Sequence, residues 1–310
     1  MRPAFSVLLF TTLIGAGQGL FLALFAAELV ARVGLMPMPD RPFFASGGAL
    51  ALLLTGAGLV ASIFHLGHPE RGWRAASRWR TSWLSREIIV LPLFMAGLFG
   101  WSVAHYAGIR ATGMLGAVTA ALAILLFLCT GMIYACLRLL QEWATPLTPI
   151  NYLLLGCASG TLLAATFAAF AGSPFAPPLA AAALLLTLAG AATRIAALVR
   201  NRALRHKSTL QSAIGVPHPR IRQTAQGFMG GSFNTREFFH GATRAKLLAI
   251  KWGFLVLAFA VPGALLAFGG ASAPVLVAAF ALQYVGLLAE RWYFFAEANH
   301  PQNLYYQAMS

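Results

Sequence analysis

The stretch FSVLLFTTLIGAGQGLFLALFAAELVARV, residues Phe5–Val33, decides the class of fold. It exceeds the roughly 20 mostly apolar residues that a helix needs to cross about 30 Å of bilayer hydrocarbon. It does not fit a cleavable signal sequence, because the apolar region of such a signal is only about 7–15 residues long. The stretch also holds the polar residues Gln18 and Glu28. It therefore predicts a permanent membrane-spanning helix.

Seven further apolar stretches of similar length follow along the chain. They are Phe43–Leu66, Leu84–Tyr106, Thr112–Leu140, Ile150–Ala171, Pro178–Val199, Leu247–Phe268 and Pro274–Phe295. Hydrophobic residues make up 59% of the 310 residues and charged residues 10%, whereas a soluble domain has about 25% charged residues. This composition excludes a soluble globular enzyme and predicts an all-α integral membrane protein with eight transmembrane helices. We expect residues 1–310 to form one transmembrane domain with a basic extramembrane loop at about 200–246.

The charged residues are distributed unequally between the two ends of the predicted spans. The chain has 22 Lys and Arg against 8 Asp and Glu, a net charge of +14. With eight spans, both termini and the loops after spans two, four and six share one side, and the opposite side carries only Arg32, Arg41 and Arg110. Lys and Arg are retained on the cytoplasmic side of membranes, so we expect both termini in the cytoplasm of a bacterial inner membrane and no nucleic-acid partner. Arginines that bind an acidic partner protein would produce the same asymmetry, and this alternative stays open.

Two ionisable side chains lie near the basic ends of spans two and three. Gly67 and Pro69 stop the second span, which puts His65 about one turn from its end. Ser82 is a good N-cap for the third span, which puts Glu87 about one turn from its start. Because consecutive spans run antiparallel, the two side chains are expected at one depth beneath the basic loop.

This pair suits the chemistry of a quinone, which takes up or releases two protons together with two electrons. Histidine titrates near neutrality, and burial pushes a carboxylate toward its neutral form. An ionisable residue within a span is a candidate functional residue by default. His65 and Glu87 are therefore candidates for a quinone site.

Four other polar residues in the spans are informative. Gln18 lies among glycines, where it serves either helix packing or contact with a ligand. Glu28 and Arg32 are one helical turn apart, a spacing typical of a local ion pair, here at the lipid interface. Glu290, near the end of the last span, reaches the same level as Glu87.

The segments FHLGHPER at 64–71 and RTSWLSRE at 80–87 resemble the membrane anchor subunit of the dimethyl sulfoxide reductase family (DmsC type), and Gln18 and ERWYFF at 290–295 fit the same pattern. The resemblance covers most of the chain. It implies a haem-free anchor that exchanges electrons between the quinone pool and two partners, a four-cluster iron–sulfur subunit and a molybdopterin catalytic subunit. It implies that His65 and Glu87 carry the quinone reaction and that Gln18 and Arg71 help to bind quinone. We add Glu290 to the binding residues because of its depth.

The basic segment at 200–246, with GGSFNTREFFH at 230–240, and the ending AEANHPQNLYY at 296–306 resemble the anchor of quinone-linked, cytoplasm-facing sulfite dehydrogenases (SoeABC type). This subtype implies that electrons from sulfite reduce quinone and that the partners lie on the cytoplasmic side. The alternative is a dimethyl sulfoxide reductase-type anchor that oxidises menaquinol. The choice between ubiquinone and menaquinone stays open.

Two other functions are weaker hypotheses. A b-haem anchor needs histidine pairs at matched depths, but only His65 and His105 lie in or beside spans, and they are at opposite faces. A transporter needs charges near the middle of the membrane and interrupted helices, and we expect a bundle whose middle is nearly free of charge. The three cysteines are too few to ligate an iron–sulfur cluster, and no metal site is expected in this chain.

Overall fold

The computed structural model describes residues 1–64, 67–205, 207–225 and 238–305, so His65 lies outside the described residues. Within these ranges the elements are helices and there is no strand. Eight of the described helical stretches are long and apolar enough to cross a membrane. The prediction of an all-helical membrane protein with eight spans is confirmed.

The spans agree closely with the predicted apolar stretches. They are α1 (Phe5–Arg32), α2 (Arg41–Ile63), α3 (Trp83–Ala107), α4 (Thr112–Ala135), α5 (Leu147–Phe170), α6 (Ala176–Arg202), the composite α9 (Arg244–Leu255), η2 (Val256–Ala260) and α10 (Val261–Phe268), and α11 (Ala273–Glu297). Short helices outside the spans are the 3₁₀ helix η1 (Pro69–Arg78), α7 (Leu210–Ile214) and α12 (Pro301–Tyr305).

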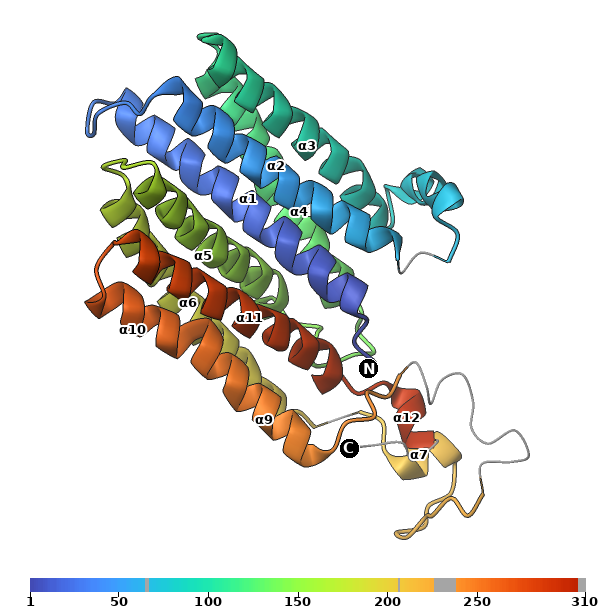
Figure 1. Ribbon diagram of the computed structural model, residues 1–310. Coiled ribbons are helices and arrows are strands. Elements are labelled where there is room, and N and C mark those ends of the chain that lie inside the picture. Colours follow the sequence, from blue (N-terminus) through green and yellow to red (C-terminus); the bar gives the residue numbers. More distant parts are fainter. Residues whose placement is uncertain (65–66, 206, 226–237, 306–310) are drawn as a thin grey trace.

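The long helices form one bundle in which α1 is central (Figure 1). Helix α1 packs against α2, α4, α5 and α11, and α5 also packs against α6 and α11. Glycines permit the closest of these contacts: a Cβ atom built on Gly160 of α5 would lie 2.2 Å from the backbone carbon of Gly19 of α1. Small residues let membrane helices approach in this way: Gly15 and Gly19 face α5, whereas Gly17 faces Ala51 and Thr55 of α2.

The seventh span is interrupted by the π turn η2, which lies directly before Pro262. Proline has no N–H to donate within a helix, and a wider turn is one way to accommodate it. Gln283 of α11 donates from Nε2 to the carbonyl oxygen of Ala258 in this turn, 3.3 Å away, and to Thr187 of α6, 2.9 Å away. The three helices are therefore joined by hydrogen bonds where the span is irregular.

One predicted boundary is wrong. The fourth span was expected to reach Leu140, but α4 ends at Ala135. The apolar residues after it turn back into the protein, where Leu140 and Trp143 are buried beside Leu8 and Phe294. The indole nitrogen of Trp143 donates to the carbonyl oxygen of Phe294, 2.9 Å away. This stretch is apolar because it packs on the bundle rather than because it meets lipid.

The beginning of the chain and the end of α11 lie at the same end of the bundle (Figure 1). The amino group of Met1 donates to the carbonyl oxygens of Phe295 and Ala298, at 3.1 and 3.0 Å. The loops after α2, α4 and α6 belong to this end as well, and we call it the terminal end. It is the end that carries most of the Lys and Arg residues.

Candidate functional site

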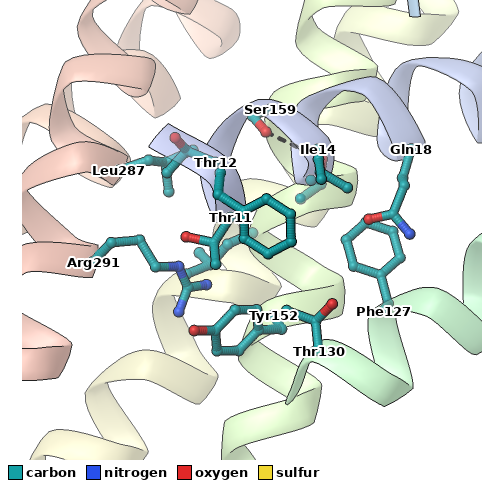
Figure 2. A pocket seen from close by; sticks show the side chains of 14 residues that line it. Thr11, Thr12, Ile14, Gln18, Phe127, Thr130, Tyr152, Ser159, Leu287 and Arg291 are labelled. Atoms are coloured by element: carbon teal, nitrogen blue, oxygen red, sulfur yellow. Dashed lines mark hydrogen bonds between the residues drawn. The ribbon is translucent and has the colours of Figure 1, made fainter. Parts of the chain in front are cut away.

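A buried pocket lies where α1, α4, α5 and α11 meet, and we call it the membrane pocket (Figure 2). It is lined by Phe10, Thr11, Thr12, Ile14, Gly15, Gln18, Phe127, Thr130, Tyr152, Leu155, Gly156, Ser159, Leu287 and Arg291, and its volume is about 20 Å³. Several of these residues belong to the first turns of α1 or the last turns of α4 and α11, so the pocket lies in the terminal half of the bundle. A void of this volume holds about one water molecule.

Gln18 forms one wall of the membrane pocket, across from Arg291 (Figure 2). Its side chain is buried, and Nε2 donates to the carbonyl oxygen of Ala123 in α4, 2.9 Å away. Gln18 therefore joins two helices and also lines a cavity. Both uses that the sequence left open are compatible with this position.

Glu87 reaches the pocket through one neighbour. It lies in the second turn of α3 and is buried, and the hydroxyl of Thr130 in α4 donates a hydrogen bond to its carboxylate. Thr130 lines the membrane pocket. Ser82 caps α3 as predicted, accepting from the backbone N–H of Ser85 at 3.4 Å. The cap fixes the start of the helix and with it the depth of Glu87.

The opposite wall is formed by a cation stacked on an aromatic ring. The guanidinium carbon of Arg291 lies 3.7 Å from the ring centroid of Tyr152, and both side chains are buried. The ring of Tyr152 is in turn stacked on Tyr134 of α4, with the centroids 5.6 Å apart. A cation over a ring face is favourable and is stronger when water is excluded, so the guanidinium is held at the pocket wall.

Beyond Arg291 lies a cluster of buried charges. The Nε atom of Arg194 in α6 is 2.7 Å from Oε1 of Glu290, and its Nη2 atom is 3.5 Å from Oε2 of Glu297. The Nε atom of Arg291 is 3.5 Å from Oε2 of Glu290.

The prediction of a bundle whose middle is nearly free of charge overlooked Arg194, which is 2% exposed. A single arginine two turns inside an apolar span was the available signal, and it indicates a buried acidic partner.

A second small cavity adjoins this cluster, and we call it the outer cavity. It is lined by Glu142, Thr145, Thr148, Asn151, Arg194, Ala197, Asn201, Glu290, Arg291 and Phe294, with a volume of about 10 Å³. Arg291 lines both cavities. Glu142 belongs to the loop after α4, and its Oε1 atom accepts from the backbone and side-chain nitrogens of Asn299, each 3.2 Å away.

Glu28 lies near the end of the bundle away from the chain termini. The predicted ion pair with Arg32 is present, with Nη2 2.7 Å from Oε1. The predicted position at the lipid interface is wrong for Glu28, because the side chain is fully buried. It also accepts from the indole of Trp101 at 2.9 Å and from Thr112 at 2.6 Å, and Nε2 of His105 is 3.3 Å away. Such a carboxylate joins α1, α3 and α4.

A wider groove lies at that same end. Its volume is about 580 Å³, and it lies between the segment 38–46 and the segment 167–174. Its ionisable lining residue is Asp40, and most of the rest of its surface is apolar. It is larger than the membrane pocket but lacks a cluster of buried proton-exchanging groups.

Three titrating groups outside the spans at the terminal end favour their neutral forms. Burial lowers the pKa of the Met1 amino group to about 6, although Glu142 acts in the opposite direction. Burial also lowers the pKa of His240 and His300, and the charge of the N-terminus adds to this. The ring of His300 stacks on Phe238, with the centroids 4.0 Å apart.

The predicted site residues are placed as follows. Gln18 lines the membrane pocket, and Glu87 is bound to a residue that does. Glu290 lines the outer cavity, which adjoins the membrane pocket at Arg291. Arg71 is 61% exposed on η1, where its Nε atom is 3.7 Å from Oε1 of Glu70. His65 lies outside the described residues, and no three His, Cys, Asp or Glu side chains are grouped as a metal site within those that are described.

The structure also brings in residues that the sequence analysis did not name as candidates. They are Thr130, Tyr152, Arg194, Glu142 and, at the other end, His105. Threonine and tyrosine are common in membrane helices, so only the packing of α4 and α5 against α1 reveals that these side chains share a cavity.

Comparison with known proteins agrees with this architecture. The family model described as "DMSO reductase anchor subunit (DmsC)" matches residues 1–295. A sulfite dehydrogenase subunit of Allochromatium vinosum is 50% identical over 327 aligned residues, which cover 100% of both chains. The chain therefore belongs to the family of DMSO reductase anchor subunits.

Proposed function

We propose that this anchor binds quinone in the membrane pocket and passes electrons between the quinone pool and an iron–sulfur subunit, which serves a molybdopterin catalytic subunit. The observation that carries the proposal is the pocket itself, a buried polar cavity in the terminal half of the bundle. Gln18, Thr130 and Arg291 supply polar atoms from three helices to one void. Polar and ionisable groups are costly to bury inside an apolar bundle, so a cluster of them is a candidate functional site.

The lining suits the two oxygens of a quinone ring. A quinone oxygen accepts hydrogen bonds, whereas the hydroxyl of a quinol also donates one. The Thr130 hydroxyl, backed by the carboxylate of Glu87, can exchange a proton with one oxygen. The Tyr152 hydroxyl and Arg291 provide donors at the facing wall. Because the void holds only about one water, the ring binds by displacing Phe127 or Phe10 from the lining.

His65 completes the site in this proposal. The chain near it leaves α2 at Ile63 and enters η1 at Pro69, the level at which α3 begins. We propose that its imidazole exchanges protons at the same depth as Glu87 and that Arg71, Gln18 and Glu290 assist quinone binding. Arg71 acts from the surface, and Glu290 acts through Arg291.

We propose sulfite as the electron source because the relative with 50% identity is a sulfite dehydrogenase subunit. The partner would oxidise sulfite and water to sulfate, two protons and two electrons, and quinone would take up two electrons and two protons to become quinol. The second candidate is the reverse flow, oxidation of menaquinol for a dimethyl sulfoxide reductase, which the name of the family model favours. Reduction of quinone by sulfite in isolated membranes distinguishes the two.

We propose that the partners bind at the terminal end and that this end faces the cytoplasm of an inner membrane, because Lys and Arg residues are concentrated there. Helix η1 presents an exposed basic and aromatic surface there, with Trp73 72% and Trp79 52% exposed. Arginines stack on these indoles, as Arg74 does on Trp73 at 5.5 Å. Tryptophan and arginine are enriched where proteins bind one another, so we place the iron–sulfur subunit over η1.

The test compares two electron acceptors in the purified complex. In Glu87→Gln, reduction of quinone should fall on the order of 100-fold, as expected when a positioned acid or base is lost. Reduction of ferricyanide at the partner subunits should stay unchanged and shows that the complex is assembled. Wild-type quinone turnover in Glu87→Gln and in His65→Arg would exclude the proposed site.

A further inference from the structure

The membrane pocket and the outer cavity are two steps of one polar line through the bundle. Arg291 lines both, with Tyr152 on the pocket side and Glu290 on the outer side. The outer cavity ends at Glu142, in the loop after α4, and at Asn201, in the last turn of α6. Polar atoms therefore follow one another from the pocket wall to the terminal face.

Glu290 has an unusual environment for a buried carboxylate. It is 1% exposed and has Arg194 and Arg291 beside it. Yet neither of its oxygens accepts a hydrogen bond of good geometry from the residues that the structure describes. Buried polar atoms are normally hydrogen-bonded, and the outer cavity beside Glu290 is about the size of one water. The carboxylate is thus held by charge but left open to water.

The hydroxyl of Tyr152 is the matching group on the pocket side. It is buried, and apart from an interaction with the Tyr134 hydroxyl it makes no hydrogen bond of good geometry among the described residues. A tyrosine hydroxyl both donates and accepts, whereas an arginine stays protonated and cannot pass a proton on. Arg291 therefore positions the two groups by stacking on Tyr152 and facing Glu290. The Tyr152 hydroxyl and the Glu290 carboxylate carry the proton.

We propose that Glu290 carries protons between the terminal face and the quinone oxygen in the membrane pocket, by way of water in the outer cavity and the Tyr152 hydroxyl. The proposal rests on the proposed function. For each quinone reduced, two electrons arrive from the iron–sulfur subunit and two protons enter past Glu142. Each proton binds Glu290, leaves it for water beside Arg291, and ends on a quinone oxygen. Oxidation of quinol runs the same steps in reverse.

The charged and polar groups around Glu290 come from several elements. Arg194 approaches from α6, Tyr152 from α5, and Glu142 from the loop after α4. On its own helix, Arg291 is adjacent and Glu297 shares Arg194. Both arginines keep their charge, so they hold the Glu290 carboxylate in place between the two cavities.

Glu28 provides a matched control. It is a glutamate as fully buried as Glu290 and is also paired with an arginine, but it lies near the opposite end of the bundle. Its oxygens accept hydrogen bonds from Arg32, Trp101 and Thr112. A variant of Glu28 therefore has a comparable cost in packing and no position on the proton line.

The experiment uses the assembled complex with Glu290→Gln, and with Glu28→Gln as control. We expect quinone-linked turnover of Glu290→Gln to fall on the order of 100-fold, with the ferricyanide rate at the partner subunits unchanged. Its solvent deuterium isotope effect should rise, because proton delivery becomes the slow step. Glu28→Gln should keep both the wild-type rate and the wild-type isotope effect.

A second variant covers the case in which Glu290→Gln does not assemble. Glu142→Gln changes the outer end of the line, and it should also lower turnover and raise the isotope effect. If Glu290→Gln and Glu142→Gln, or whichever of them assembles, show wild-type turnover and a wild-type isotope effect, the proposed proton path is wrong. The quinone site would be unaffected by that result, since quinone still binds. Failure of the wild-type complex to bind quinone would overturn both.

Discussion

The hydroxyl of Thr130 on α4 donates a hydrogen bond to the buried carboxylate of Glu87 on α3. Through this bond a residue of α3 acts on a pocket that α3 does not line. The bond also joins α3 to α4 at the level where the pocket lies.

Removal of this hydroxyl tests the relationship directly. Thr130→Val leaves a buried carboxylate without its donor, which should cost about 1–3 kcal/mol of stability and lower quinone turnover. Thr130→Ser retains the hydroxyl and should stay close to wild type. Thr119→Val is the matched control, because Thr119 donates only within α4, to Leu115. Thermal unfolding and quinone-linked rates of the three variants distinguish these outcomes, and equal rates in Thr130→Val and Thr119→Val would contradict the account.

The volume of the membrane pocket can be reduced by substituting one of the glycines that line it, Gly156. A Cβ atom on Gly156 would lie 2.4 Å from Cε1 of Phe127, so Gly156→Ala should push this ring into the pocket. Overpacking costs about 1–3 kcal/mol of stability. The smaller pocket should also bind quinone less tightly, with about a tenfold loss of affinity for each 1.4 kcal/mol of binding energy lost. A Cβ atom on Gly15 has its nearest neighbour at 3.5 Å, so Gly15→Ala should change affinity little. Titration with a quinone analogue compares the two, and an unchanged Kd in Gly156→Ala would show that quinone binds elsewhere.

The pair of Arg194 and Glu290 should behave as a coupled unit in unfolding experiments. Arg194→Met leaves Glu290 buried without its nearest cation, and breaking a buried pair costs about 3–5 kcal/mol. The double variant Arg194→Met/Glu290→Gln should lose less stability than the sum of the single variants. Thermal unfolding of the complex in detergent measures this coupling, and strict additivity would show that the ion pair does not form.

Orientation is tested at two alanines that end successive helices. Ala171 follows α5 and Ala203 follows α6, and both are exposed. Cys136, which is also exposed, is first replaced by serine. A membrane-impermeant maleimide applied to intact cells should then label Ala171→Cys and leave Ala203→Cys unlabelled. The reverse pattern would place the terminal end outside the cytoplasm.

The spans were predictable because length and apolarity suffice to define a membrane helix. The end of α4 was not, since Leu140 and Trp143 are as apolar as lipid-facing residues but are buried by protein. The depth of Glu87 followed from the cap at Ser82. Its neighbours did not follow, because a helix that is apolar on all sides gives no indication of which helix it contacts.

Gln18 and Glu290 were recognised as polar residues in apolar spans, and both lie at buried cavities. Arg194 was overlooked although its position in a span carried the same signal. The cavities themselves could not be predicted, because Thr130 and Tyr152 become pocket residues only through the packing of α4 and α5 around α1.

Photolabelling with an azido-quinone tests most directly whether the membrane pocket binds quinone. After illumination of the assembled complex, peptides that contain Gln18, Thr130 or Tyr152 should carry the label, and excess unlabelled quinone should prevent it. Label confined to the groove at the opposite end, between segments 38–46 and 167–174, would contradict the account.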